Sequence, residues 1–282
     1  MQALKNTPPL DSNMRNILNT VRRYFKIYKV FLNLNLNTLF AYRANFINSL
    51  VANSVWGIFG IVAMLLLTSK VSNVFGWSRD ELLILAGVYN MIFSIFYLLF
   101  SSNFGEFSNN IHYGRLDAIL TKPVDSQFMM TCTNIRYAQL VRLILGGGFV
   151  VYVINQMHTE ITFFIIMNFV FYLFLSVIIL YSLWLMIMTL TVWYTKLSNL
   201  VDFLYEAHNV AKYPQEIYHG LNFVTYLVIF PLTLVVVIPT KALLQKVLLG
   251  DLLWPVITAV VLFYVARNFW KFALRSYTSA SG

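Results

Sequence analysis

"ITFFIIMNFVFYLFLSVIILYSLWLMIMTLTVWY" occupies residues 161–194 and decides the class of fold. The run contains no Gly, no Pro and no charged residue. A helix that crosses the hydrocarbon core of a bilayer needs about 20 apolar residues. A helix of this run would be about 50 Å long, against a core of about 30 Å. The run therefore predicts one tilted membrane helix that extends beyond the bilayer at one end.

The rest of the chain has the composition of a membrane protein. Of its 282 residues, 59% are apolar and only 11% are charged, and the mean hydropathy is +0.69, whereas soluble domains carry about 25% charged residues. Five further apolar blocks occur at roughly 44–67, 81–100, 137–156, 221–240 and 252–273. The sequence thus predicts an all-α, polytopic membrane protein whose six transmembrane helices span residues 44–273.

The segments outside this domain have different characters. Residues 1–13 lack the apolar core of a signal peptide and are predicted to be a mobile tail. Residues 14–43 alternate apolar and polar positions with a helical period and predict an amphipathic interfacial helix. The basic side chains of this helix, each worth about 1 kcal/mol near anionic headgroups, are Arg22, Arg23, Lys26 and Lys29. The helix either anchors the chain at the inner leaflet or transmits motion from a partner to the first span. Residues 274–282 form the predicted C-terminal tail.

The basic residues choose the orientation of the spans. Six spans place both termini on one side, and sixteen of the 20 Lys and Arg residues fall on that side. Because cytoplasmic loops are enriched in Lys and Arg, both termini are predicted to be cytoplasmic. The same rule places two segments in the cytoplasm, the loop 110–125 and the stretch Lys196–Gly220.

Motifs of enzymes and ion-driven carriers are missing from the sequence. Gly146–Gly148 is not followed by the Lys and Ser or Thr of a phosphate-binding loop. The triplet lies inside the third span, where it allows close helix packing or local flexibility, or contacts a ligand. The four histidines have no metal-ligand spacing. No Asp or Glu lies in the middle of a predicted span, which argues against an ion-coupled engine. We therefore predict no catalytic residue, no metal, no bound cofactor and no nucleic-acid partner.

Neutral polar residues and prolines mark two further features of the spans. Polar side chains inside the spans either form interhelical hydrogen bonds or line a substrate path, and they are Asn48, Asn53, Asn90, Ser94 and Asn168. Pro231 and Pro239 lie in the fifth span, which we expect to be broken or kinked at a gate. A short re-entrant or outer-surface helix is expected over residues 240–251.

The loop 110–125, "NIHYGRLDAILTKPVD", is polar and lies between two apolar blocks. Leu116, Ile119 and Leu120 have helical spacing, Gly114 breaks the chain before them, and Pro123 ends the turn. The loop is therefore predicted to form a short cytoplasmic helix with a small apolar face. Such a face suits a groove on a soluble partner.

This loop resembles a motif of the type-2 ABC exporter permeases. The pattern G-x-L-D-x-x-L-x-(K/R)-P-(V/L) fits residues 114–124, and it is most similar to the subgroup described as ABC-2 family transporter proteins. The stretches "KYPQEIY" at 212–218 and "LRSYTSASG" at 274–282 are similar to that subgroup as well. The resemblance covers roughly residues 20–280.

The resemblance implies a transmembrane permease subunit of an exporter in the cytoplasmic (inner) membrane. It implies that two permeases pair, as a homodimer or a heterodimer, and bind separate cytoplasmic ABC ATPase subunits that hold ATP and Mg. The N-terminal amphipathic helix and the loop 110–125 would make that contact, with the loop as its main element, and Lys196–Gly220 would be a second contact. The contact residues implied in the loop are Tyr113, Gly114, Arg115, Leu116, Asp117, Ile119, Leu120, Lys122 and Pro123.

Two other classes of function stay open at the level of the sequence. An ion-coupled secondary transporter or channel would transport without nucleotide, and a membrane-embedded enzyme or scaffold would need a catalytic constellation. The aromatic and aliphatic spans suit a lipid-like or hydrophobic cationic substrate. Any surface that faces lipid has the same composition.

Overall fold

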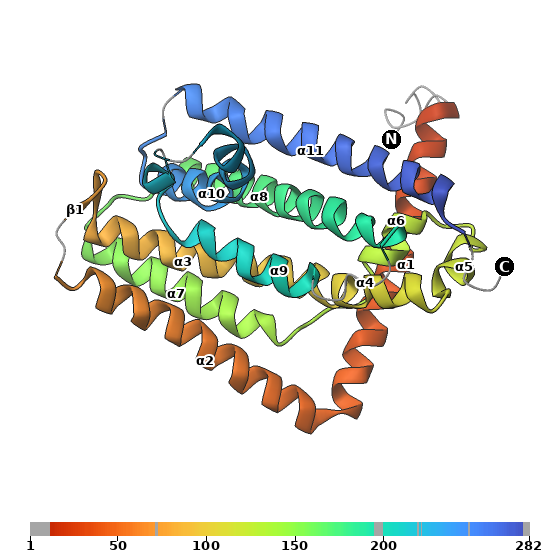
Figure 1. Ribbon diagram of the computed structural model, residues 1–282. Coiled ribbons are helices and arrows are strands. Elements are labelled where there is room, and N and C mark those ends of the chain that lie inside the picture. Colours follow the sequence, from red (N-terminus) through yellow and green to blue (C-terminus); the bar gives the residue numbers. More distant parts are fainter. Residues whose placement is uncertain are drawn as a thin grey trace, which may run out of the picture. The chain divides into compact units, whose positions relative to one another are not determined.

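The computed structural model describes residues 12–70, 73–194, 200–218, 220, 222–247 and 249–278 (Figure 1). Residues 1–11 of the predicted tail lie outside this range. The chain divides into two units, Met1–Arg43 and Ala44–Gly282. The first unit contains helix α1, Ser12–Ala41, where the sequence pattern predicts an amphipathic helix. Arg22, Arg23 and Lys26 lie together along this helix.

The second unit is built from long apolar helices. These are α2 (Arg43–Thr68), α3 (Arg79–Phe96), α4 (Ser102–His112), α7 (Gln139–Gln156), α8 (Phe163–Thr189), α10 (Phe223–Leu243) and α11 (Leu249–Ser276). Within the described residues, five helical segments are long and apolar enough to cross a membrane, with α3 and α4 counted as one. The prediction of an all-α, polytopic membrane protein is confirmed. The run 161–194 forms a single helix, α8, extended by the 3-10 turn Leu190–Val192.

Helix α3 is the centre of this unit. It begins with a capping box, in which Ser78 accepts from the backbone N–H of Glu81 and the Glu81 carboxylate accepts from the N–H of Ser78. A π-helical turn, Tyr97–Ser101, joins it to α4 without a break. The apolar side chains of α3 are almost all buried, because α7, α8 and α10 pack around it. One continuous helix therefore runs from Arg79 to His112.

Small residues set the distance between α3 and α7. A Cβ on Gly87 would clash with the Val150 side chain, and a Cβ on Gly146 would lie 3.0 Å from the Asn90 Cβ and 3.1 Å from the Gly87 carbonyl oxygen. The two backbones touch here, so the packing interpretation of the glycine triplet holds for Gly146. At Gly148 an added Cβ would meet nothing within 4 Å.

The helical bundle has two distinct ends, which Figure 1 shows at opposite ends of α3. At the first, the hairpin end, β1 (Asn73–Val74) pairs antiparallel with β2 (Trp77–Ser78) and joins α2 to α3. At the second, the loop end, α5 (Arg115–Leu120) and α6 (Ser126–Thr131) form the loop 110–125 and its continuation.

A broken segment returns along α3 from the loop end to the hairpin end. It consists of α9 (Leu200–Ala207) and the 3-10 turns His208–Lys212 and Gln215–Tyr218. The His208 ring lies 4.6 Å from the Phe93 ring in the last turn of α3, and Glu216 accepts a 3.1 Å hydrogen bond from the Trp77 indole in the hairpin. The prediction that Lys196–Gly220 stays on the side of the loop 110–125 is therefore wrong for residues 200–218. The segment is short and polar, so an average of hydropathy does not detect it.

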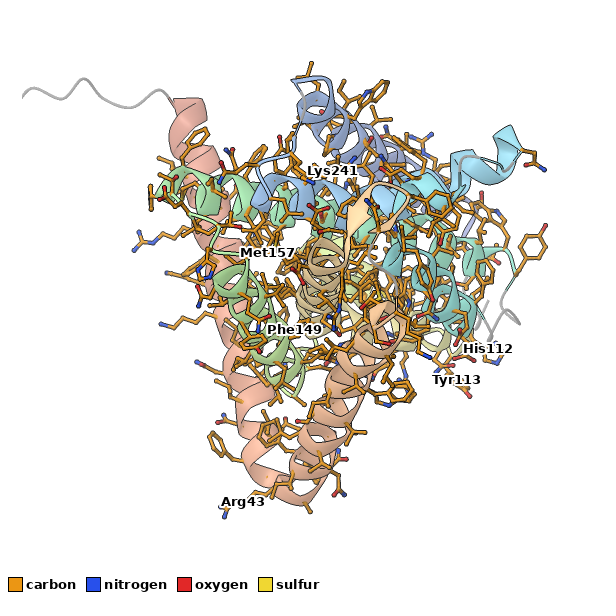
Figure 2. The ribbon with its side chains drawn as sticks, turned by 90° about the vertical axis from the view of Figure 1, so that its left-hand side faces the viewer. Arg43, His112, Tyr113, Phe149, Met157 and Lys241 are labelled. Atoms are coloured by element: carbon orange, nitrogen blue, oxygen red, sulfur yellow. The ribbon has the colours of Figure 1, made fainter. Side chains whose placement is uncertain are left out.

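Helix α10 lies at the hairpin end, which faces the viewer in Figure 2. The helix is not broken at Pro231 or Pro239. Proline lacks the N–H that would bond the carbonyl four residues earlier. For Pro239 that carbonyl belongs to Val235, and the Ser176 hydroxyl of α8 donates to it at 2.6 Å. A neighbouring helix thus satisfies the group that the proline leaves free.

The region after α10 also differs from the expectation. The separate helix predicted over residues 240–251 is not formed, because residues 240–243 end α10 and Leu249 begins α11. Two ion pairs tie this region to the bundle. Lys241 lies 3.4 Å from the Glu216 carboxylate, and Lys246 pairs with Glu81 at the start of α3.

Candidate functional site

The loop 110–125 forms a small helix that is anchored on one side and exposed on the other. Gly114 adopts a left-handed conformation with φ of 65°, which turns the chain from α4 into α5. Leu116 is fully buried in the core of the bundle. Tyr113 and Leu120, in contrast, are 66% and 43% exposed. The apolar residues of the loop are therefore divided between an anchor and an outward face.

The other residues implied in partner contact lie around this exposed face. The Arg115 guanidinium lies 5.8 Å from the centre of the Tyr113 ring, and Lys122 and Pro123 are exposed. Asp117 lies beside the Tyr277 hydroxyl at the end of α11, where burial and then the carboxylate raise the pKa of the tyrosine. All nine residues are adjacent in space because they are adjacent in the chain.

A salt bridge between Arg267 and Asp125 connects the loop end to α11. Arg267 donates from Nη1 to Asp125 Oδ1 at 3.0 Å and from Nη2 to Asp125 Oδ2. Nη1 also donates to Gln127 Oε1 at 2.7 Å. Asp125 is the N-cap of α6, since its Oδ1 accepts from the Phe128 N–H at 3.1 Å. Burial alone would raise the pKa of Asp125, but the bonds from Arg267 and Phe128 leave it below its usual range.

A tryptophan adds a second connection from α11. The Trp270 indole is fully buried and donates to the Ser126 hydroxyl at 3.2 Å. Its ring meets the Phe107 ring of α4 edge-on at 5.4 Å. Helices α4, α6 and α11 are thus joined beside the loop 110–125.

A cavity of about 530 Å³ lies farther into the bundle, between α2, α3, α7 and the broken segment 200–213. Its volume falls in the range of sites for drug-sized molecules. Aromatic residues from three of these elements form its walls, and they are Trp56, Phe59, Tyr89, Tyr97, Tyr205 and Tyr213. Helix α2 forms one side of the cavity, and few of its residues are buried.

Charged and polar side chains face the cavity among these rings. The Arg142 Nε donates to the Asn90 Oδ1 at 2.8 Å, and the Lys212 ammonium lies 5.5 Å from the centre of the Tyr89 ring. Asn209 donates to the Glu206 carboxylate at 3.0 Å. His208 is hydrogen-bonded to the Tyr97 hydroxyl at 3.0 Å. The cavity therefore offers both apolar surface and ionic groups.

The structure separates the polar residues that the sequence suggested for a substrate path. Asn53 and Asn90 line the cavity. Asn48 is exposed on α2, and Asn168 is half-buried on α8, away from the lining. Ser94 is buried and donates to the Asn90 carbonyl within α3. Only two of the five residues meet in one place.

Sequence reasoning missed most of the ionic lining of the cavity. Arg142 was not among the residues suggested for a substrate path, and the stretch that contains Glu206, His208 and Lys212 was predicted to lie in the cytoplasm. A signal for this stretch exists in the sequence. Leu200, Leu204 and Ala211 recur at helical spacing and form an apolar stripe on a segment that also carries charged residues.

The bundle of long apolar helices, with its internal cavity and its anchored loop, defines a polytopic membrane protein. A family model described as "ABC-2 family transporter protein" matches residues 54–281, so the chain belongs to this family and is a permease component of an ABC transporter, not itself the ATPase. The family implies association with ABC ATPase partners. Neither a curated protein nor a solved structure matches the chain.

Proposed function

We propose that the chain is the permease subunit of an ATP-driven exporter in the cytoplasmic (inner) membrane, with both termini in the cytoplasm. Separate ATPase subunits bind ATP and Mg and dock on the loop 110–125. The observation that carries the proposal is the exposure of Tyr113, just before α5, and of Leu120, at the end of α5, while Leu116 between them is fully buried. A face that is apolar, exposed and firmly anchored suits a groove on a soluble partner.

The contacts at the loop end give the force a route to the cavity. A push on α5 acts through Leu116 and the turn at Gly114 on α4, which is continuous with α3 through the π-helical turn. Helix α3 carries Tyr89 and Asn90, and the π-helical turn carries Tyr97, on the wall of the cavity. The Arg267–Asp125 bonds carry the same push to α11. Closure of the ATPases would therefore move cavity walls rather than a loop alone.

Pairing with a second permease completes the proposal. Only Gly57, Met64 and Thr68 of α2 are buried within the chain, although the helix is strongly apolar. Lipid or a second permease must cover the remaining surface. Cysteine cross-linking along α2 in native membranes distinguishes the two, because periodic cross-links form only across a dimer.

Ion-coupled transport remains the second candidate because the structure brings Glu206 into the cavity. A carboxylate near a substrate site is a common proton carrier. This candidate predicts transport by the chain without nucleotide, and loss of that transport in Glu206→Gln.

The experiment for the exporter is purification from native membranes with the ATPase that accompanies the chain. We expect Leu120→Asp to reduce the ATPase that co-purifies, because it places a charge in an apolar contact. Leu120→Met is the matched control, since it preserves the apolar side chain and should retain the ATPase. Purification of the chain without any nucleotide-binding partner would overturn the proposal. Equal retention of ATPase by both variants would show that the loop 110–125 is not the docking site.

A further inference from the structure

The charges that line the cavity do not balance. Three cationic side chains, Arg136, Arg142 and Lys212, face it, against the single carboxylate of Glu206. Among the residues that the structure describes, neither Arg142 nor Lys212 has a carboxylate within 4 Å. Lys212 interacts electrostatically with Arg142 and, less strongly, with Glu206. Cations held without a matching anion attract one from outside.

An unsatisfied amide lies on the same wall. Gln139 is 8% exposed and lines the cavity, and its side-chain oxygen has no hydrogen-bond partner in the described part of the chain. Buried side-chain polar atoms are normally hydrogen-bonded, and an orphan requires an explanation. The amide can turn by half a rotation and offer N–H donors in place of the oxygen. A polar group of a ligand would satisfy it in either orientation.

The surface beyond these groups is aromatic. Trp56 and Phe59 of α2 line the cavity together with Tyr89 of α3 and Tyr97 of the π-helical turn. A flat aromatic or hydrocarbon body would bury apolar area against these rings. Aromatic faces alone would also attract a cation. The cations already present oppose this, since Lys212 lies over the Tyr89 ring at 5.5 Å.

We propose that this cavity binds an amphipathic organic anion, with its carboxylate, sulfonate or phosphate at Arg142 and Lys212 and its apolar body against the aromatic rings. Gln139 completes the polar end of the site. The inference rests on the proposed transport function and specifies its substrate class. It replaces the hydrophobic cation that composition alone suggested, because the excess of positive charge repels a cation. A soluble anion and the headgroup of an anionic lipid share this chemistry.

Calorimetry with three naphthalene probes that differ in charge tests the proposal. The full chain is placed in phosphatidylcholine nanodiscs, and heats from empty discs are subtracted. The probes are 2-naphthalenesulfonate, 2-naphthalenemethanol and 2-naphthylmethylammonium. We expect the sulfonate to bind at least about tenfold more tightly than the alcohol, as ionic hydrogen bonds allow, and the ammonium to bind most weakly. Competition by phosphatidylglycerol in the discs would assign the site to lipid headgroups. Its absence would assign the site to soluble anions.

Variants of the lining connect this preference to the named residues. Arg142→Gln and Lys212→Gln should each weaken sulfonate binding about tenfold and leave the alcohol unchanged. Arg142→Lys keeps the charge and should retain most of the affinity. Glu206→Gln removes the opposing carboxylate and should strengthen sulfonate binding. Lys271→Gln, on the exposed surface of α11, is the control without effect.

Equal binding of the three probes, or tighter binding of the ammonium, would overturn the anion site. So would sulfonate binding that survives both Arg142→Gln and Lys212→Gln. If one of these variants does not fold, the tighter sulfonate binding expected of Glu206→Gln still tests the proposal, and its absence would overturn the anion site. No ATPase takes part in these measurements, so their failure leaves the proposed coupling at Leu120 untouched. Conversely, a chain that lacks an ATPase partner can still bind the sulfonate.

Discussion

Leu116 and Leu120 lie one helical turn apart on α5. We expect replacement by Ala to lower the stability of the fold at Leu116 and to weaken the partner contact at Leu120. Leu116 is fully buried and Leu120 is 43% exposed. Replacement of a fully buried Leu by Ala costs about 2–5 kcal/mol, because packing is lost and a cavity remains. At the exposed site the three lost carbons, at about 0.8 kcal/mol per buried group, cost about 1 kcal/mol after correction for exposure. The first change should therefore damage the fold and the second the partner contact.

The assay is thermal unfolding of the solubilised chain, followed by chromatography of the fraction that stays monodisperse. In a domain of this size, 1 kcal/mol corresponds to about 2–4 °C in Tm. We expect Leu116→Ala to lower Tm by about 6–12 °C, for a loss of about 3 kcal/mol, and Leu120→Ala by about 2–4 °C. ATPase retention should follow the reverse order at temperatures where both variants are folded. Similar losses of Tm in the two variants would refute the division of α5 into an anchor and a docking face.

Three further predictions test the packing, the link to α11 and the course of the broken segment. Gly146→Val should lower the stability of the bundle by more than about 2 kcal/mol, because the new side chain would meet the backbone of α3. Gly148→Val should cost less, because the space around Gly148 is free, and thermal unfolding of the two variants measures the difference. Arg267→Gln should cost about 1 kcal/mol, since the pair with Asp125 is about 30% exposed. The pKa of Asp125 is depressed in the folded chain, so the stability from the Arg267–Asp125 pair is present at neutral pH and is lost as the pH falls below about 4. Unfolding of both chains at several pH values measures this loss. An equal cost of Arg267→Gln at all pH values would contradict the ionic link. Ile217→Cys, in a chain whose native Cys132 is replaced by Ser, should react with a membrane-impermeant maleimide from the side of the hairpin; labelling from the side of the loop 110–125 would show that the segment does not cross.

The sequence predicted individual helices best. The apolar run 161–194 is long enough to cross a membrane as a helix, which satisfies its own backbone groups in lipid, and it does form α8. Gly114 and the spacing of Leu116 and Leu120 placed a short helix in the loop 110–125, as α5 confirms. These predictions depend on local physics, so they need no knowledge of the neighbouring elements.

Contacts between distant residues decided the rest. Helix α10 continues through Pro239 because Ser176, 59 residues earlier in the chain than Val235, bonds the carbonyl that the proline leaves free. No local pattern contains that information. The proline rule predicts a break or a kink, and only the partner helix determines that the helix stays continuous.

The cavity shows the same division between sequence and tertiary structure. The sequence by itself predicted a membrane bundle with a polar loop that suits a partner, and its composition suggested a lipid-like or hydrophobic cationic substrate. Only the fold decided that residues 200–213 return along α3 and bring Glu206 and Lys212 opposite Arg142. Charges that are more than 60 residues apart in the chain meet because α7 and the broken segment both lie beside α3. The electrostatic character of the site is thus a property of the packing, since a potential depends on distances in space and not along the chain.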